Sequence, residues 1–363
     1  MNGLKKTPLY HEHERLGAQM APFGGWMMPI QYGGILAEHR WCRESAAMFD
    51  TSHMGELLFR GDFVDSGLES LFTFRVGAIA IGRCRYGFLL NDGGGVVDDL
   101  TVYRMADDEA MIVVNAGPAD KDFSVIRDAV AGRGFLENAT GRTGKLDLQG
   151  PLSREVLAAV FGPEIGDIPF FGFRRMNVAG SEALVSRTGY TGELGYEIYL
   201  EADRLPTVWQ QLLEDDRVRP AGLGARDLLR LELGYSLYGS DLDESTTPLE
   251  AGLERFVDFS RDFVGREALL CRQAQGPDRL KAAFKVSSRR TPRHGYRIFC
   301  QGEPVGEVTS GAFSPMLGRG IGLGYVKPSA AARGTFLEIR HESVVMEAVV
   351  VDLPFYRGGS LRM

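Results

Sequence analysis

Short stretches of alternating apolar and polar residues follow one another along the chain, separated by glycine-rich turns. Residues 86–90 and 96–104 predict two antiparallel strands, because the Asn-Asp-Gly-Gly-Gly segment at 91–95 can supply the positive φ angles of a tight reversal. The apolar run at 110–115 predicts a third strand beside them. Together these segments predict part of a sheet.

The rest of the chain contains segments with the two-residue period of strands and segments with the 3.6-residue period of helices. Residues 183–187 and 195–200 predict a second hairpin, and residues 225–232 have helical spacing. Thr-Pro-Leu-Glu at 247–250 has the form of a capping box and predicts the start of a helix. A Gly-Pro pair within residues 273–279 precedes a glycine-rich tail of short β-like runs, which predicts a small β domain. With no repeat of fixed period, the pattern favours an α+β fold.

Size and charge limit the class of protein. The chain has 363 residues, enough for two or three domains. Its formal net charge of -7 opposes a nucleic-acid partner, because such proteins normally gather a basic excess. No apolar run approaches the roughly 18 to 20 residues that span a bilayer, and the N-terminus lacks an apolar signal core. We therefore expect a cytoplasmic protein without a membrane partner.

Signatures of common catalysts and metal sites are missing from the sequence. It contains no Gly-x-x-x-x-Gly-Lys-[Ser/Thr], no His-Glu-x-x-His, no Gly-x-Ser-x-Gly and no complete dinucleotide fingerprint. The four cysteines lie far apart without a Cys-x-x-Cys pair or a nearby histidine cluster, so we expect reduced thiols and no metal. They are Cys42, Cys84, Cys271 and Cys300.

Two adjacent carboxylates follow the glycine-rich turn within an otherwise apolar strand. Consecutive strand residues face opposite ways, so only one of Asp98 and Asp99 can point into a given pocket. If Leu90 and Val96 flank the turn, Tyr86 falls within about one residue of the position opposite Asp99, and an aromatic ring there would suit a flat heterocycle. The alternative is that both aspartates simply bind amide groups of the turn.

Three further residues are candidates with equally ordinary alternatives. Arg226 lies in the first turn of the predicted helix, where the macrodipole disfavours a cation; it either binds an anion or pairs within the helix, for example with Asp227. Glu197 faces away from Tyr196 on its predicted strand, toward a pocket or toward solvent. Tyr190 occupies a glycine-flanked loop.

Read together, the motifs resemble the glycine-cleavage T-protein family over essentially the whole chain. One block is Phe-Asp-Thr-Ser-His-Met-Gly at 49–55, and another is Arg-Thr-Gly-Tyr-Thr-Gly-Glu at 187–193. Each block alone is weak, but their number and order make the resemblance specific. In chain order the blocks are residues 7–10, 22–26, 29–32, 49–55, 91–103, 148–151, 187–193, 221–227, 238–239, 246–252, 306–311 and 353–356.

The resemblance implies a three-domain, folate-binding aminomethyltransferase fold of the α+β class, with folate held in a central hole. It implies a discontinuous first domain at residues 1–53 and 145–272. A ferredoxin-like insertion would occupy residues 54–144, and a C-terminal β-barrel-like domain residues 273–363.

The resemblance also implies an activity. An aminomethyl group would pass from the lipoyl arm of a carrier, the H-protein, to tetrahydrofolate, giving methylenetetrahydrofolate and ammonia without a metal or redox cofactor. The family's essential aspartate matches Asp99. The implied folate contacts are Met54, Tyr86, Asn115, Tyr190, Glu197 and Arg226, with Arg357 or Arg362 as a C-terminal contact.

Other proteins of this fold offer alternatives. Folate-dependent demethylases move a methyl group from sulfur, whereas dimethylglycine and sarcosine dehydrogenases need a flavin-binding region for which the chain lacks the length. A folate-binding relative used in iron–sulfur assembly carries a Lys-Gly-Cys-x-x-Gly-Gln-Glu type motif where this chain has Thr-Gly-Tyr-Thr-Gly-Glu at 188–193. Leu194 departs from the acidic residue common in the T-protein family, a change that we expect only to tune the loop.

Overall fold

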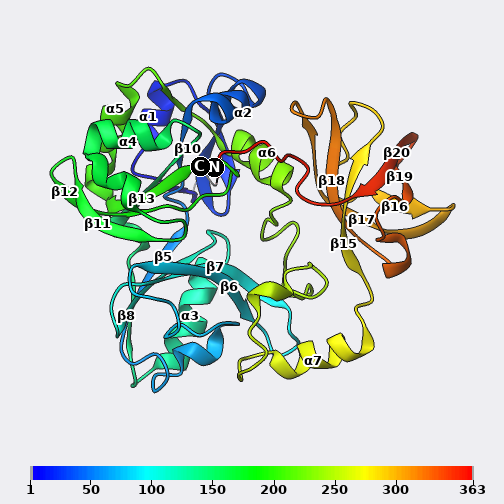
Figure 1. Ribbon diagram of the computed structural model, residues 1–363, viewed down its shortest axis with the longest axis horizontal. Coiled ribbons are helices and arrows are strands. Elements are labelled where there is room, and N and C mark those ends of the chain that lie inside the picture. The colour runs from blue at the N-terminus through cyan, green and yellow to red at the C-terminus, as the bar shows by residue number, and fades with distance from the viewer. Residues whose placement is uncertain (1–2, 362–363) are drawn as a thin grey trace.

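A computed structural model describes residues 3–361, whose strands form four sheets, one of them a closed barrel. In Figure 1 a six-stranded sheet with its helices lies at the upper left, a five-stranded sheet at the lower left and the barrel at the right. The predicted α+β class and the predicted C-terminal barrel are confirmed. The residue boundaries of the three domains stay a prediction.

The six-stranded sheet carries helices on both faces. Its strands, in spatial order, are β11 (Phe173–Val178), β12 (Ser181–Ser186), β13 (Gly195–Glu201), β10 (Thr143–Gln149), β4 (Ala46–Asp50) and β14 (Val218–Pro220). One face buries an apolar core under α1 (Tyr10–Arg15), α4 (Ser153–Phe161) and α5 (Leu205–Leu213). The other face packs at its β4 end against α2 (Ile35–Glu44) and α6 (Leu223–Leu233).

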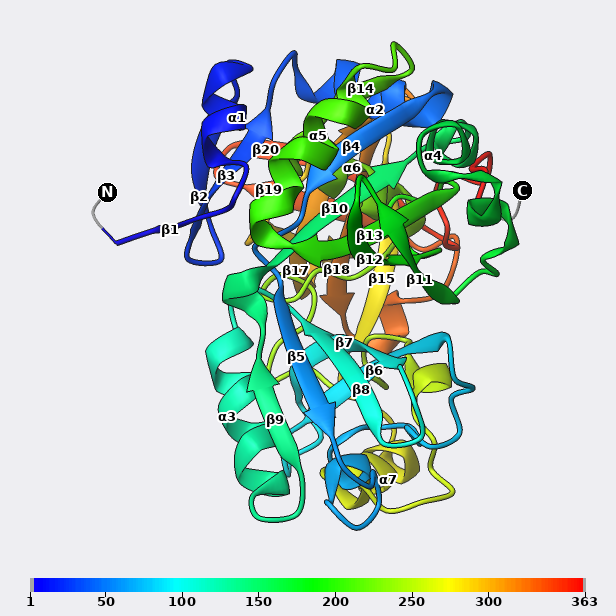
Figure 2. The same ribbon diagram turned by 90° about the vertical axis from the view of Figure 1, so that its left-hand side faces the viewer.

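The five-stranded sheet has α3 (Ala119–Val130) on one face. Its spatial order is β6 (Arg83–Leu90), β7 (Val96–Arg104), β8 (Glu109–Val114), β5 (Gly55–Arg60) and β9 (Phe135–Asn138). Ile126 and Val130 of α3 pack against Leu100 and Val102 of β7 in one apolar core. The opposite face contacts the six-stranded sheet through an apolar cluster that includes Tyr103 and Tyr199. Figure 2 shows the six-stranded sheet above the five-stranded one.

The barrel contacts the rest of the molecule through α6, which packs against β17 and β18. Its strands are β15 (Leu280–Val286), β18 (Arg319–Val326), β17 (Glu303–Ser314), β16 (Arg297–Cys300), β19 (Phe336–His341) and β20 (Val344–Val351). Helix α7 (Arg266–Gln275) precedes β15. A small sheet contains β1 (Lys5–Lys6), β3 (Trp26–Gln31) and β2 (Gln19–Phe23). Short 3₁₀ helices are η1 (Leu68–Leu71), η2 (Thr140–Arg142), η3 (Pro163–Asp167), η4 (Ala202–Arg204), η5 (Glu254–Phe256) and η6 (Pro328–Ala330).

Both predicted hairpins form, β6 with β7 and β12 with β13. In the first turn Gly94 has the positive φ, at 79°. Gly95 is needed for a different reason, because a Cβ there would meet the carbonyl oxygen of Glu244 at 1.8 Å. The turn is therefore pressed against another segment of the chain as well as being tight.

The prediction that a helix starts at residues 247–250 is wrong. The reciprocal bonds of a capping box do form: Thr247 N–H donates to the Glu250 carboxylate at 2.8 Å, and Glu250 N–H donates to Thr247 Oγ1 at 3.2 Å. The chain nevertheless makes turns through residues 248–252 before η5. Gly252 adopts a positive φ of 66° there, which a continuing helix cannot accommodate.

Candidate active site

One face of the five-stranded sheet, on the side opposite α3, gathers four of the predicted site residues in two neighbouring rows. We call it the carboxylate face. The first row runs across β6, β7, β8 and β5 through Tyr86, Thr101, Val113 and Glu56. In the next row lies Asp99, and at the same end of the sheet Asn115 follows β8 and Met54 precedes β5.

Asp99 is held by donors from two sides. The Tyr86 hydroxyl donates to its Oδ2 at 2.9 Å, and Asn115 Nδ2 donates to its Oδ1 at 2.9 Å. Burial raises the pKa of Asp99 to about 6, although these two hydrogen bonds pull the pKa down. The carboxylate is therefore fixed in place and ionised at neutral pH.

The register of the hairpin differs from the expected one by a bulge. An unbroken register from Leu90 and Val96 would put Gly87 opposite Asp99 and turn the Tyr86 side chain to the other face. A shift between Leu89 and Leu90 instead places Phe88 opposite Asp99. Tyr86 is then a diagonal neighbour on the same face, so the predicted contact forms for a reason that the sequence did not reveal.

Asp98 does not bind amides of the turn. Its Oδ2 accepts from the backbone N–H of Asn115 at 2.9 Å and its Oδ1 from Asn115 Nδ2 at 2.8 Å. The turn is closed by Asn91 instead, whose Oδ1 accepts from Gly95 N–H at 2.9 Å. The two aspartates thus face opposite sides of the sheet but share one asparagine.

Glu197 lies in a buried cluster and not at the surface. Its carboxylate accepts from Lys145 Nζ at 2.8 Å, from Thr188 Oγ1 at 2.5 Å and from the Tyr103 hydroxyl at 3.1 Å. The alternative of solvent exposure is wrong. Because Tyr103 belongs to β7 and Glu197 to β13, this carboxylate joins the two sheets.

Arg226 has no partner among its helical neighbours. Its NH1 donates to Asp147 Oδ2 of β10 at 2.6 Å, while Asp227 pairs with Arg230 at 2.8 Å. The alternative of an intrahelical pair is therefore wrong. The Arg226 guanidinium also lies 5.3 Å from the centre of the Tyr190 ring, close enough for a cation–π contact.

Lys145, which the sequence analysis missed, connects these groups. Besides Glu197, its buried ammonium donates to Asp147 Oδ1 at 3.1 Å and contacts Met54 Sδ at 3.5 Å. Burial alone would lower the pKa of Lys145, but the charges of Asp147 and Glu197 raise it above its ordinary value. The signal was present: Lys145 and Asp147 alternate with Leu146 and Leu148, so two charges share one face of a buried strand. We call Lys145, Asp147, Glu197 and Arg226 the ion cluster.

Tyr190 and the barrel meet at one serine. The Tyr190 hydroxyl donates to the carbonyl oxygen of Ser236, and its ring stacks on Tyr235 with centroids 5.8 Å apart. Lys281 of β15, another residue that the sequence analysis missed, donates from Nζ to Ser236 Oγ at 2.7 Å. Burial lowers the pKa of Lys281 to about 8.

Within the described part of the chain, the predicted C-terminal contact, Arg357, makes no hydrogen bond to another predicted site residue. Arg357 is exposed, and its NH2 donates to the carbonyl oxygen of Leu353 at 3.4 Å. Nearby, Ser360 Oγ donates to the Glu193 carboxylate, so this tail is anchored beside the Tyr190 loop. Arg362 lies outside the described residues.

Glu56 is a second missed carboxyl group on the carboxylate face. It is fully buried, and neither of its oxygens has a hydrogen-bond partner within residues 3–361. Burial raises the pKa of Glu56 well above its ordinary value, although Lys145 opposes the shift. Burial therefore favours the protonated, neutral form of this side chain.

We predict a pH-dependent effect of Glu56→Gln on stability. The raised pKa means that the folded wild type binds a proton that the unfolded chain loses above about pH 4.5. Between about pH 4.5 and the pKa of Glu56 in the folded protein, the wild-type free energy of unfolding therefore falls as the pH rises, by about 1.4 kcal/mol per pH unit. The variant lacks this term, so urea unfolding should show its stability relative to wild type rising with pH. A constant difference across pH 5–8 would contradict the prediction.

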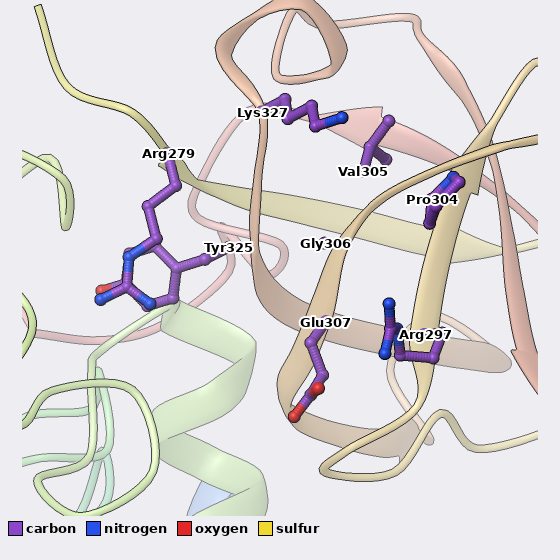
Figure 3. Close-up of a pocket in the computed structure, with 8 residues that line it drawn as sticks. All are labelled: Arg279, Arg297, Pro304, Val305, Gly306, Glu307, Tyr325 and Lys327. Carbon is purple, nitrogen blue, oxygen red and sulfur yellow. The ribbon is translucent and has the colours of Figure 1, made fainter.

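An open hollow lies elsewhere, on the outer face of the barrel. Its volume is about 450 Å³. Figure 3 shows Arg279, Arg297, Lys327 and Glu307 among the residues that line it. Arg279 stacks over Tyr325 with 4.7 Å between its guanidinium carbon and the ring centre, and it donates to Glu250 at 2.9 Å. None of the predicted site residues between 3 and 361 lines this hollow, so the candidate active site is the carboxylate face with the ion cluster.

Neither metal ligation nor membrane spanning is indicated by the described part of the chain. Between residues 3 and 361, no three or more His, Cys, Asp or Glu side chains are grouped to hold a metal ion. Within the same residues, no helix combines the length and apolar character needed to cross a membrane.

The chain matches known proteins along almost its whole length. Residues 9–261 match the GCVT N-terminal domain, and residues 281–357 match the glycine cleavage T-protein C-terminal barrel domain. Aminomethyltransferases of Halothermothrix orenii and Thermotoga petrophila are each 44% identical to it, over 97% and 99% of this chain and 100% of each relative. The crystal structure of the glycine cleavage system aminomethyltransferase T from Bartonella henselae superposes with a TM-score of 0.93 at 34% identity, covering 98% of this chain and 99% of that one.

Fold and site together define an enzyme of the aminomethyltransferase class, built from two packed sheets and a C-terminal barrel. The full-length matches make the assignment specific. The chain belongs to the glycine cleavage T-protein family.

Proposed function

We propose that this enzyme transfers an aminomethyl group from the lipoyl arm of H-protein to tetrahydrofolate. The donor carbon begins bonded to the lipoyl sulfur and to an amino nitrogen, and it ends bonded to two folate nitrogens. Sulfur leaves with a proton as the dihydrolipoyl thiol, and the amino group leaves as ammonia. The products are methylenetetrahydrofolate, ammonia and a dihydrolipoyl arm.

The observation that carries the proposal is the fixed carboxylate of Asp99. When sulfur leaves, positive charge develops on the iminium fragment, and an ionised carboxylate nearby stabilises that charge. The same group can take a proton from the attacking folate nitrogen. Tyr86 and Asn115 hold Asp99 in one orientation, so little reorganisation is needed at the moment of reaction.

The remaining residues would position the folate. Tyr190 and Tyr86 offer aromatic surfaces to a flat ring, and Glu197 offers a buried acceptor for its N–H groups. Arg226, beside the Tyr190 ring, is the cation for an anionic part of the ligand. The proposed folate contacts are Met54, Tyr86, Asn115, Tyr190, Glu197, Arg226 and Arg357.

Arg226→Ala should weaken folate binding. Loss of a charge-assisted hydrogen bond is worth about 1.5–3 kcal/mol, so we expect the folate Kd to rise about tenfold or more. Fluorescence or calorimetric titration measures this. Circular dichroism must show a folded variant, because Arg226 also pairs with buried Asp147. A wild-type Kd would remove Arg226 from the folate site.

The proposal is tested by incubating the enzyme with aminomethyl-loaded H-protein and tetrahydrofolate and measuring ammonia. Release should require both substrates and should be accompanied by methylenetetrahydrofolate. Methyl-sulfonium compounds in place of the loaded H-protein test the demethylase alternative. Methyl transfer from them without ammonia release from loaded H-protein would overturn the proposal.

A further inference from the structure

A second carboxyl group lies behind the candidate site, on helix α3. Asp122 is fully buried and belongs to the stripe of α3 that also buries Ile126 and Val130. Asp98 is fully buried as well, on the face of β7 that packs against this stripe. The helix and the strand therefore bring two carboxyl groups together inside an apolar core.

The donors around this pair are unequally distributed. Asp98 accepts two hydrogen bonds from Asn115, at 2.9 and 2.8 Å. Neither oxygen of Asp122 has a hydrogen-bond partner within residues 3–361. A buried carboxyl group without donors favours its protonated form, whereas the two donors from Asn115 favour an ionised Asp98. The two groups can then bond to each other only through the proton of Asp122.

Asn115 connects the pair to Asp99. Its single Nδ2 group donates to Asp98 Oδ1 at 2.8 Å and to Asp99 Oδ1 at 2.9 Å. We propose that Asp98 and Asp122 share one proton and that this pair, through Asn115, positions the carboxylate of Asp99. The inference rests on the proposed function, because the role of Asp99 belongs to that proposal. Asp122 is then a positioning residue.

The electrostatic environment agrees with one shared proton. Burial raises the pKa of Asp122 to about 7, and burial together with the charges of Asp122 and Asp99 raises the pKa of Asp98 well above its ordinary value. Lys121 lies next to Asp122, but its ammonium donates to Glu244 at 2.7 Å. The other titratable groups near the pair are Glu244, Tyr86 and Tyr238.

Loss of the shared proton should shift Asp99 through Asn115, which donates hydrogen bonds to both Asp98 and Asp99. Two adjacent buried carboxylates repel each other, so the hydrogen bonds that Asn115 donates to Asp98 would be strained at alkaline pH. An asparagine at position 122 keeps a donor for Asp98 but has no proton to lose. An alanine there provides no donor and leaves Asp98 to take up the proton itself, which weakens its hold on Asn115.

The test compares Asp122→Ala and Asp122→Asn, with Asp120→Ala as a matched control on the same helix, where the side chain is 85% exposed. In the ammonia-release assay we expect D122A to lower kcat about tenfold to a hundredfold, the scale of a misplaced catalytic group, with a much smaller change in folate Kd. D122N should recover most of that loss, and D120A should match wild type.

The pH profile separates positioning from a merely structural role. Wild-type kcat should decline at alkaline pH as the pair ionises, and D122N should lack the part of the decline that belongs to the pair, whereas Lys281 titrates alike in both proteins. A D122A enzyme with wild-type kcat, or a D122N enzyme with the wild-type alkaline limb, would overturn the inference.

An infrared measurement keeps the two proposals distinguishable. The difference spectrum of wild type minus D122N should contain the C=O band of a protonated carboxyl group, whether or not ammonia is released. An inactive wild type that shows this band refutes the proposed function but supports the shared proton. Absence of the band refutes the shared proton even in an active enzyme.

Discussion

Asp99→Asn should lower kcat about 10²-fold or more while leaving folate binding and folding nearly unchanged. The single oxygen of the new amide can still accept from Asn115 Nδ2, and its NH2 group can donate to the Tyr86 hydroxyl oxygen in place of the bond that this hydroxyl now donates, so the local geometry should survive. The negative charge that stabilises the developing iminium is lost. Steady-state kinetics of ammonia release and a folate titration measure the two effects separately.

The wild-type profile at acid pH provides an independent control on Asp99. Because burial raises the pKa of this carboxyl group to about 6, kcat should fall as the pH drops through that value. The residual activity of D99N should lack this limb. Wild-type turnover by D99N, or an unchanged acid limb, would exclude Asp99 as the catalytic carboxylate.

Lys145→Met should lower the free energy of unfolding by about 3–5 kcal/mol, the usual cost of removing one partner from a buried ion pair. The substitution leaves Glu197 and Asp147 buried without their shared cation, which lies 2.8 and 3.1 Å from them. Methionine has nearly the length of lysine, so the lost charge dominates over lost packing. Urea unfolding followed by circular dichroism gives the value.

A surface pair and a double variant control this result. Arg142 and Glu137 are separated by 2.7 Å but are largely exposed, so Arg142→Ala should cost less than about 1 kcal/mol. The double variant K145M/E197Q should be less destabilised than the sum of its single changes. The reason is that E197Q removes a carboxylate that K145M leaves buried without its cation. Additive effects would show that the two side chains act independently.

The sequence predicted elements better than contacts. Period-two patterns and turn residues predicted both hairpins. The alternation of strand faces predicted that Asp98 and Asp99 point to opposite sides of the sheet. The contact of Tyr86 with Asp99 depends on a bulge between Leu89 and Leu90, which no residue type in that segment announces. Register is a property of two strands together, so one strand's pattern did not fix it.

The missed residues share a physical cause. Three of them, Glu56, Asp122 and Lys145, are ionisable side chains that are fully buried, against the usual preference for the surface. Their burial is made possible by partners from distant segments, as for Lys145, or by a neutral form, as for Glu56. The wrong prediction of a helix at residues 247–250 also comes from distant parts of the chain that a local pattern does not contain. The local capping bonds form, but the chain continues in turns.

Strand order in the six-stranded sheet has a consequence for synthesis of the chain. Within the described residues 3–361, strand β4 pairs only with β10 and β14, and all five of its positions are buried. The whole five-stranded sheet is encoded before either of these partners. A nascent β4 therefore emerges from the ribosome with both edges open and before most of the residues that cover Met48 and Phe49 have been made. Cellular yield of this enzyme should therefore depend on chaperone protection during that interval.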